Sequence, residues 1–493
     1  MAISDALLSR LADPDLLPAA GLVDGRWIEQ VPGGATFAVT NPANGEEIAT
    51  LPDMGAAETA EAIGAAYRAQ KAWAAKTAKE RSAALRKLHD LILAHADDLG
   101  TILTMEMGKP FGEAKGEVRY GAAYLEWFAE EARRVQGDVL PGQQGDKRVL
   151  VLKQPIGVVG MITPWNFPSA MLARKMAPAL GVGCAVVAKP AEQTPLSAIA
   201  LARLCERAGL PAGLFNLIVG MDGPAIGKAM CADTRLRKLS FTGSTEVGRI
   251  LMRQGADHIL KLSLELGGNA PFIVFDDADL DAAAKGAILS KYRNAGQTCV
   301  CANRIYVQDG IYDAFAEKFA GAARTLRPGD GFADGVDMGP LIDADGLAKV
   351  EDHVADALSK GAELVTGGSR SNAGALFYEP TVLRNVTADM KLAREETFGP
   401  VAPLFRFETV DEVIEQANAT DYGLAAYFYA RDLSRVWRVA EALEYGMIGV
   451  NTGIISNEGA PFGGVKQSGL GREGSRYGAD DYLEMKYVCL GGV

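Results

Sequence analysis

The residue with the clearest capacity for chemistry is Cys299, in the middle of the segment 291–304. It lies among small and polar residues rather than in an apolar run, which favours a thiol that faces a cleft. A free thiol has a pKa of about 8.5, so a nucleophilic cysteine needs a base, a helix terminus or a nearby cation. None of the four histidines is close to Cys299 in sequence, so a cysteine–histidine pair has no local support. The alternative is that Cys299 and Cys301 are small structural hydrophobic residues.

Two other polar residues are placed where an active site would need them. Asn166 lies in a turn between Pro164 and Pro168, directly after an apolar stretch. Such a rigid turn can direct an amide NH2 at a developing oxyanion, although asparagine beside proline is also a common turn residue. Glu265 is the single carboxylate of the apolar stretch 262–268, where a charge is costly unless it is paired or functional. We therefore interpret Glu265 as a candidate general base.

Length and charge restrict the class of protein. A chain of 493 residues exceeds the roughly 250–300 residues served by one core, so two or more domains are expected. The net charge of -12 disfavours nonspecific binding to nucleic acid or to anionic membranes. Six scattered cysteines do not make a disulfide framework, and neither a leader-like start nor a long apolar span is found. We expect a cytoplasmic protein.

The first part of the chain predicts mainly helices. The stretch 56–100 has an alanine-rich helical periodicity, and a second helix fits the range 113–135. Tyr120, Tyr124 and Trp127 fall on one face of that second helix. We interpret this aromatic face as helix packing rather than as a cofactor site.

From residue 149 onward, short apolar strands alternate with helices, which is typical of an α/β sheet. Open α/β sheets bind ligands at the carboxyl ends of their strands, where Lys189 and Glu192 follow the stretch 185–188. These two side chains suit the ribose hydroxyls of a phosphate-bearing ligand. A further strand opens onto the glycine turn 242–248, a strand–turn–helix pattern that favours dinucleotides without matching G-x-G-x-x-G.

Several short motifs then occur together in one order. They are Pro164-Trp165-Asn166-Phe167-Pro168, Lys189-Pro190, Phe241-Thr242-Gly243-Ser244, Glu265-Leu266-Gly267-Gly268, Gly296-Gln297-Thr298-Cys299, Glu396 with Phe398-Gly399-Pro400, and Pro461-Phe462-Gly463-Gly464. Over nearly the whole chain this order resembles the aldehyde dehydrogenase superfamily. Each motif alone is weak, but their agreement in register makes chance a poor explanation.

The resemblance implies an α/β aldehyde dehydrogenase fold with three parts. A Rossmann-like NAD-binding domain would comprise residues 1–134 and 154–266, and an α/β catalytic domain residues 267–477. A small β oligomerisation arm would comprise residues 135–153 and 478–493. Members of the superfamily are homodimers or homotetramers, so the same is expected here, and no metal is implied.

The resemblance also implies a reaction. Cys299 would attack the aldehyde carbon, while Asn166 and the Cys299 backbone N–H stabilise the oxyanion. Collapse of this adduct would send a hydride to the nicotinamide and leave a thioester on Cys299. Glu265 would activate water for hydrolysis of the thioester, or help to deprotonate the thiol, and the product would be a carboxylic acid.

A larger set of residues is implied for the cofactor. The resemblance places there Ile162, Thr163, Pro164, Trp165, Lys189, Glu192, Gly220, Gly223, Phe241, Thr242, Gly243, Ser244, Val247, Leu266, Glu396 and Phe398. Lys189 and Glu192 would bind the adenosine ribose, and Glu396 the nicotinamide ribose. Because a carboxylate repels a 2′-phosphate, Glu192 favours NAD over NADP.

A narrower resemblance concerns the substrate. The segments 167–175, 293–301 and 466–474 look like succinate-semialdehyde dehydrogenases, in which the arginines matching Arg174 and Arg293 hold the distal carboxylate, helped by a serine near Ser456. A guanidinium pairs a carboxylate bidentately, as an acidic protein with an anionic substrate requires. The alternative for Arg174 is a structural pairing on its helix. In this subfamily Cys299 and Cys301 can also form a reversible disulfide, which would make Cys301 a redox switch.

Other functions remain as alternatives. Glutarate semialdehyde differs from succinate semialdehyde by one methylene, worth only about 1–3 kcal/mol of discrimination, and a broader aldehyde range is a further option. A superfamily member that has lost catalysis is disfavoured because Asn166, Glu265 and Cys299 are all present. A cofactor-independent thiol esterase would form acid without added NAD.

Overall fold

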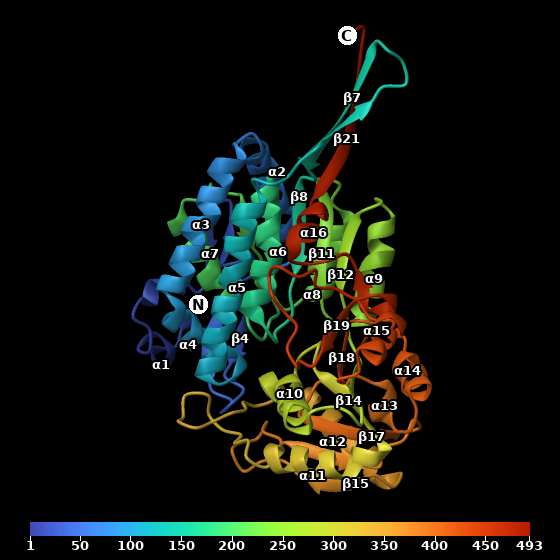
Figure 1. The fold of residues 1–493 in the computed structure, drawn as a ribbon. Coiled ribbons are helices and arrows are strands. Elements are labelled where there is room, and N and C mark those ends of the chain that lie inside the picture. The colour runs from blue at the N-terminus through green and yellow to red at the C-terminus, as the bar shows by residue number, and fades with distance from the viewer.

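Two large sheets and a projecting three-stranded arm organise the chain, as the computed structural model of residues 1–493 shows (Figure 1). The first sheet has the order β20-β12-β11-β8-β9-β10-β2-β3. Its parallel strands are β8 (Val158–Ile162), β9 (Ala185–Lys189), β10 (Phe215–Leu217), β11 (Leu236–Thr242) and β12 (Lys261–Glu265). Its antiparallel strands are β2 (Gly21–Val23), β3 (Arg26–Ile28) and β20 (Gly469–Leu470).

The strand order of this sheet creates a ligand-binding crevice. After β8, helix α6 (Pro168–Val182) leads to β9 on one side, and α7 (Leu196–Ala208) leads on to β10. The chain then crosses back through α8 (Gly223–Ala232) to β11, on the other side of β8. In open α/β sheets, ligands bind outside the carboxyl ends of the strands at such a reversal. The crevice therefore opens where β8 and β11 end.

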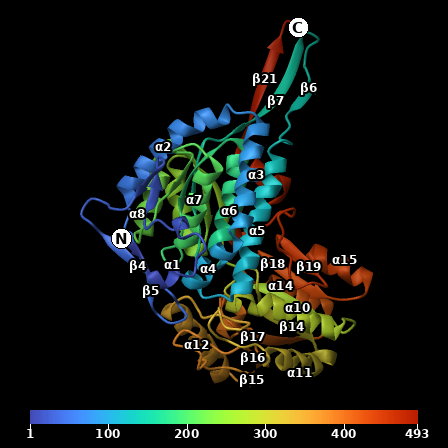
Figure 2. The ribbon, with the colours of Figure 1, turned by 90° about the vertical axis from the view of Figure 1, so that its left-hand side faces the viewer.

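Long helices cover this sheet, and Figure 2 shows several of them side by side. They are α2 (Ala56–Ala74), α3 (Ala78–Ala94), α4 (Ala96–Met107) and α5 (Phe111–Glu131). The helical stretch predicted for residues 56–100 is thus divided into three. One division lies at Thr77, where a capping box begins α3: Thr77 Oγ1 accepts from Glu80 N at 3.3 Å, and Thr77 N donates to Glu80 Oε2 at 2.8 Å. Every residue of α6 is buried between these helices and the sheet.

The second sheet has the order β15-β16-β17-β14-β13-β18-β19. The strands are β13 (Ala270–Val274), β14 (Ala302–Gln308), β15 (Glu363–Thr366), β16 (Thr381–Arg384), β17 (Val401–Phe407), β18 (Ala425–Tyr429) and β19 (Met447–Val450). Helices α10 (Leu280–Tyr292) and α11 (Tyr312–Ala323) share one core with the sheet, whereas α12 (Ala344–Ser359), α14 (Val410–Asn418) and α15 (Leu433–Ala442) share another. Both faces are therefore covered, as a mainly parallel sheet requires.

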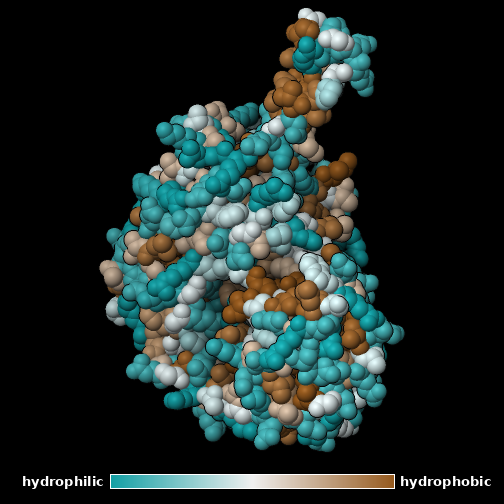
Figure 3. Space-filling model, viewed as in Figure 1, coloured by the Kyte–Doolittle hydropathy of each residue, from teal (hydrophilic) through white to brown (hydrophobic).

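The arm is a sheet of its own, with the order β21-β7-β6. It contains β6 (Asp138–Pro141), β7 (Lys147–Pro155) and the terminal strand β21 (Leu483–Gly491). It projects from the body, and Figure 3 shows apolar side chains on its surface. The exposed large hydrophobic residues of the arm include Val139, Met485 and Tyr487, which are 77%, 75% and 66% exposed. No helix of the protein has the length and apolar character needed to cross a membrane.

Smaller elements complete the fold. A second three-stranded sheet joins β1 (Ala2–Ile3), β4 (Thr36–Thr40) and β5 (Glu47–Pro52), and the short helices are α1 (Asp5–Leu8), α13 (Lys391–Arg394) and α16 (Ser475–Asp480). Strand β20 pairs with Leu264 and Glu265 of β12. The range 267–477 expected for the catalytic domain therefore contributes one strand to the first sheet.

Candidate active site

Cys299 follows a strained loop between α10 and β14. Asn294, Ala295 and Gly296 all have a positive φ, of 53°, 56° and 76°. Left-handed backbone at two non-glycine residues persists only where the surroundings over-determine it. Gln297 provides part of that restraint, because its Nε2 donates to both Asn294 O and Pro340 O at 3.1 Å. The loop carrying the thiol is thus fixed by one contact within itself and by another to the segment at Pro340.

Two cavities meet at the Cys299 side chain. One, of about 270 Å³, contains two arginines and is called the arginine cavity. Its lining is Glu113, Gly116, Glu117, Tyr120, Phe167, Met171, Arg174, Arg293, Thr298, Cys299, Val300, Ser456 and Phe462. The other, of about 380 Å³, is called the Glu265 cavity, and it also contains Asn166, Thr242, Gly243, Ser244, Glu396 and Phe398. Cys299 and Met171 line both cavities, so the thiol can meet a ligand that enters from either one.

Asn166 and Glu265 are brought to the same cavity from different elements. Asn166 stands in the turn after β8, and its Nδ2 donates to Gln297 O at 3.0 Å. An amide NH2 has two hydrogens, so one remains for a group beside Cys299. Glu265 is the last residue of β12, is buried, and neither of its carboxyl oxygens has a hydrogen-bond partner in the protein. Both oxygens are therefore available to a water molecule or to the thiol.

Buried charges set the protonation of this cavity. Burial raises the pKa of Glu265 well above its ordinary value, and the nearby Glu473 carboxylate raises it further, while Lys175 and Arg174 oppose the shift. Burial likewise raises the pKa of the Cys299 thiol to about 12, with the Glu396 carboxylate adding to the effect. The resting pair is thus a neutral acid beside a neutral thiol. A proton must leave each group before it can act as base or nucleophile.

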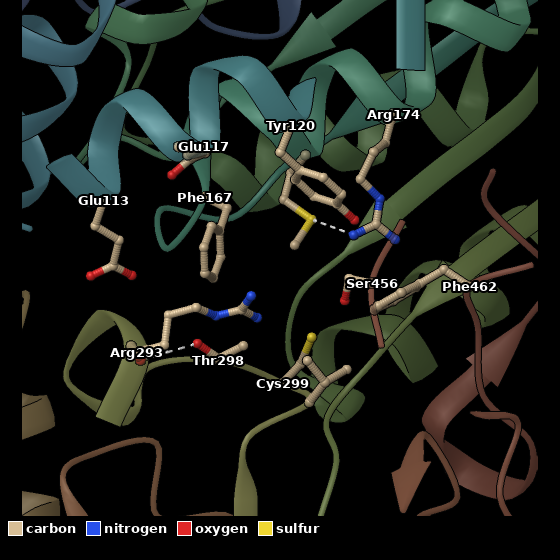
Figure 4. A pocket seen from close by; sticks show the side chains of 13 residues that line it. Glu113, Glu117, Tyr120, Phe167, Arg174, Arg293, Thr298, Cys299, Ser456 and Phe462 are labelled. Atoms are coloured by element: carbon tan, nitrogen blue, oxygen red, sulfur yellow. Dashed lines mark hydrogen bonds between the residues drawn. The ribbon is translucent and has the colours of Figure 1, made fainter. Parts of the chain in front are cut away.

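The two arginines approach the arginine cavity from opposite walls (Figure 4). Arg174 comes from α6 and is buried, and its Nη2 lies 2.7 Å from Glu473 Oε2. Arg293, at the end of α10, makes no ion pair, and its guanidinium lies 5.4 Å from the centre of the Phe167 ring. Ser456 and Phe462 close the same side of the cavity as Arg174 (Figure 4). Arg293 is therefore the arginine that can pair with an anionic ligand without first losing an ion pair within the protein.

Most residues predicted for the cofactor lie at the carboxyl ends of strands β8 to β12 of the first sheet, whereas Glu396 and Phe398 precede β17 of the second sheet. Lys189 ends β9, and its Nζ lies 2.7 Å from Glu192 Oε2. Gly243 and Ser244 follow β11, and the Ser244 hydroxyl accepts from Val247 N at the start of α9 (Thr245–Ala256). The N-terminus of this helix presents backbone N–H groups to the crevice, which suits a phosphate.

The sequence profile described as the aldehyde dehydrogenase family matches residues 27–488 of this chain. The chain belongs to the aldehyde dehydrogenase family. It is an oxidoreductase with the fold of its relatives: the crystal structure of an Escherichia coli NADP-dependent enzyme superposes with a TM-score of 0.96 at 60% identity, covering 98% of this chain and all of that one.

Curated relatives of this aldehyde dehydrogenase have different names. The 3-sulfolactaldehyde dehydrogenase of Pseudomonas putida is 61% identical over 98% of this chain and 99% of its own length. The NADP(+) succinate-semialdehyde dehydrogenase GabD of Escherichia coli is 60% identical over 98% of this chain and all of its own. The glutarate-semialdehyde dehydrogenase of Pseudomonas aeruginosa is 59% identical over 98% of this chain and all of its own. The chain is thus similar to enzymes named for three different short aldehydes.

The residues of this aldehyde dehydrogenase fit a dinucleotide. A Cβ added to Gly223 would lie 3.8 Å from Lys189 Nζ, so the absence of a side chain keeps the space before that ammonium open. At the other end of the crevice, Gly268 N donates to Glu396 Oε1 at 3.2 Å, and burial raises the pKa of Glu396 to about 7. Trp165 packs edge-on against Phe398, with ring centres 5.5 Å apart. Carboxylates at both ends can accept from ribose hydroxyls, and the start of α9 lies between them.

The second cysteine of the loop, Cys301, is buried beside a lysine. Its Sγ lies 3.8 Å from Lys291 Nζ and 3.2 Å from Gly296 O. Burial raises the pKa of Cys301, and the Lys291 ammonium partly opposes the shift. Cys299, in contrast, is partly exposed.

Sequence reasoning missed several residues of the site. Tyr120, assigned to helix packing, lines the arginine cavity, and its hydroxyl lies 3.0 Å from that of Tyr124. Glu113 lines the same cavity, where burial raises its pKa and so reduces its repulsion of an anionic ligand. Lys175 and Glu473 pair beside Glu265 although 298 residues separate them. No local pattern in the sequence marks such a pair. The aromatic face of α5, in contrast, is visible in the sequence and could have been interpreted as the wall of a cavity.

Proposed function

We propose that this enzyme oxidises a short aldehyde with a distal carboxylate, succinate semialdehyde foremost, to the corresponding acid with NAD. The observation that supports this proposal is the arginine cavity, in which Arg174 and Arg293 stand on opposite walls above the Cys299 thiol. A protein with a net charge of -12 attracts an anion only through such local cations. The guanidinium fork suits a carboxylate better than a lysine would.

The two arginines have different parts in this proposal. Arg174 is held in place by Glu473, which also pairs with Lys175, and its Nη1 faces the Met171 sulfur at 3.7 Å. Arg293 makes no ion pair, although its charge acts on the Glu113 carboxyl in the same cavity, so its guanidinium is free to pair with the substrate carboxylate. The Ser456 hydroxyl, also in the lining, can donate a further hydrogen bond.

The reaction follows from the residues around the thiol. Cys299 loses its proton and forms a C–S bond to the aldehyde carbon, while the Asn166 amide and the Cys299 backbone N–H donate to the oxygen. When bound, the nicotinamide supplies the hydride acceptor that converts this adduct to a thioester. Glu265, as the carboxylate, then takes a proton from a water molecule that attacks the thioester carbon, and the acid leaves with the thiol restored.

The length of the substrate is less constrained than its charge. Succinate and glutarate semialdehydes differ by one methylene, and relatives named for each are similarly close to this chain. A methylene changes discrimination by only about 1–3 kcal/mol, so glutarate semialdehyde is the second candidate substrate. Both share an aldehyde at one end and an anion at the other.

Replacing Arg293 tests the substrate class. Arg293→Met is expected to lower kcat/KM for succinate semialdehyde by about 10- to 100-fold, because a hydrogen-bonded charge partner of the carboxylate is lost. Butyraldehyde, which has the same chain length without the carboxylate, should lose little. Initial rates of NADH formation with succinate semialdehyde, glutarate semialdehyde and butyraldehyde give the three ratios. If wild type oxidises butyraldehyde as well as the acids, or if Arg293→Met lowers all three alike, the proposed substrate is wrong.

The preference between cofactors is tested at Glu192. The Glu192 carboxylate, which pairs with the buried Lys189, would repel a 2′-phosphate. A relative is nevertheless named for NADP. Glu192→Ser is expected to raise kcat/KM with NADP by about tenfold relative to NAD, since one charge at short range is worth about 1.4 kcal/mol or more. Kinetics with each cofactor at saturating aldehyde provide the measurement. An unchanged ratio, with NADP already preferred by wild type, would contradict the role of Glu192.

The arm supports a proposal about assembly. Its exposed apolar residues, Val139, Met485 and Tyr487, would be covered by a second copy of the chain, so we expect a homodimer or homotetramer. The oxidative switch at Cys301 also remains a proposal, in which a Cys299–Cys301 disulfide would block the nucleophile reversibly.

A further inference from the structure

A buried ion pair lies behind the turn that carries Asn166. Lys109 follows α4, Glu117 belongs to α5, and Lys109 Nζ lies 2.6 Å from Glu117 Oε2. Both side chains are essentially inaccessible, at 0% and 1% exposure. Two charges are rarely withdrawn from water this completely for stability alone, because desolvation offsets most of their attraction.

The pair is hydrogen-bonded to both sides of the turn. Lys109 Nζ donates to Asn166 O at 2.8 Å and lies 4.0 Å from the centre of the Phe167 ring. An ammonium has three donors, and Glu117, Asn166 and the ring face account for them. Glu117 Oε1 meanwhile accepts from Ser169 N at 3.0 Å and from Ala170 N at 3.2 Å.

Those two N–H groups belong to the first turn of α6, which has no cap of its own. The N-cap residue Phe167 has no side-chain acceptor, and Pro168 occupies the first turn. Glu117 therefore caps α6 from a neighbouring helix, while Lys109 holds the residue just before it. The two charges fix where α6 begins and where the Asn166 carbonyl points.

The same carbonyl has a second restraint from the Cys299 loop. Asn294 Nδ2 donates to Asn166 O at 2.9 Å, and Asn166 Nδ2 donates to Gln297 O at 3.0 Å. Both contacts come from the loop that precedes Cys299, which is called the nucleophile loop. Lys109 thus supplies the only contact with Asn166 O that comes from outside the nucleophile loop, and it ties the amide to the long helices of the first domain.

We propose that Lys109 and Glu117 are positioning residues that hold the Asn166 amide at the oxyanion, a role that rests on the proposed chemistry at Cys299. They touch no reacting atom, although Glu117 also lines the arginine cavity. They act through the backbone of Asn166, so their loss should lower kcat through misplacement of the donor and leave the affinity for the aldehyde largely unchanged. Misplacement of a catalytic group by about 1 Å can cost on the order of 10²-fold.

The test is a double-mutant cycle with Asn166→Ala. Lys109→Met with Glu117→Gln removes both charges together, so no unpaired charge is left buried, and the glutamine keeps an acceptor for α6. In the wild-type background this change is expected to lower kcat by about 10²-fold with KM altered by less than about threefold. In the Asn166→Ala background the same change should lower kcat by less than about threefold. A full 10²-fold loss in both backgrounds, or no loss in either, would overturn the proposal.

Glu106 provides a matched control for the structural part of the effect. Like Glu117 it is a buried glutamate that caps another helix, accepting from Leu196 N at 2.7 Å and Ser197 N at 2.9 Å at the start of α7. Glu106→Gln removes a buried cap without leaving an unpaired charge, so it is expected to lower Tm but, unlike Lys109→Met with Glu117→Gln, to leave kcat within about threefold of wild type. Equal effects of both variants on kcat would show that general destabilisation, and not positioning, is responsible.

The double-mutant cycle can be interpreted whether or not the proposed substrate is correct. It is run with butyraldehyde and with succinate semialdehyde, and each ratio compares variants on one aldehyde. Poor turnover of succinate semialdehyde by wild type would remove the substrate proposal and leave the butyraldehyde cycle valid. Additive losses with both aldehydes would remove the positioning role and leave the substrate proposal intact.

Discussion

Cys299→Ala is expected to lower kcat/KM for every aldehyde by about 10⁵-fold or more, because the C–S bond on which all later steps depend cannot form. The side chain lies where the two cavities meet, and no other thiol lines either of them. NADH formation with succinate semialdehyde measures the loss. Calorimetric titration with NAD should give an unchanged Kd, since the alanine removes only one sulfur atom from the crevice.

The neighbouring cysteine is the control for this result. Cys301→Ala removes a buried thiol two residues along the same loop and should retain most of the activity. Iodoacetamide should correspondingly modify the partly exposed Cys299 before the buried Cys301, as mass spectrometry of the digested protein would show. Substantial activity in Cys299→Ala would eliminate the thioester route and with it the proposed reaction.

Glu265→Gln is expected to lower steady-state kcat by about 10²- to 10⁴-fold while the first turnover persists, because the thioester forms but is not hydrolysed. Stopped-flow absorbance should show a burst of one NADH per active site followed by slow turnover. Intact-protein mass spectrometry should find the acyl group on the enzyme. Loss of the burst itself would contradict a role in hydrolysis and assign Glu265 to activation of the thiol.

The pH dependence of hydrolysis gives a second test of Glu265 as the general base. Burial and Glu473 raise its pKa, so the neutral acid is favoured at low pH and the carboxylate that acts as base accumulates as pH rises. Wild-type kcat should therefore increase as pH rises above the ordinary range of a carboxyl group, and the glutamine variant should lose this increase. The burst rate should still rise with pH in both proteins, because deprotonation of Cys299, whose pKa is raised to about 12, governs it. A pH-independent kcat in wild type would exclude Glu265 as the base.

Much of the fold could be predicted because local sequence patterns determine many of its helices, strands and turns. The helix expected at 113–135 is present as α5, and the glycine turn at 242–248 does lead into α9. Apolar periodicity, proline and glycine turns and helix caps act over a few residues, so helices and turns can be predicted from them. The division of the stretch 56–100 into three helices depended on a capping box at Thr77 that periodicity alone does not reveal.

The chemical types and their order could be taken from the sequence alone: a thiol among polar residues, an amide between prolines, and a single carboxylate in an apolar strand. How these groups are held and charged depends on the tertiary structure. The tertiary structure pairs Arg174 with Glu473, places Lys109 against Asn166 O, and leaves Arg293 without an ion pair. Such contacts join residues tens to hundreds of positions apart, and packing of whole helices and sheets selects them. Local sequence propensity cannot predict these contacts, since the energy of a buried charge depends on its partner in space rather than on its neighbours in the chain.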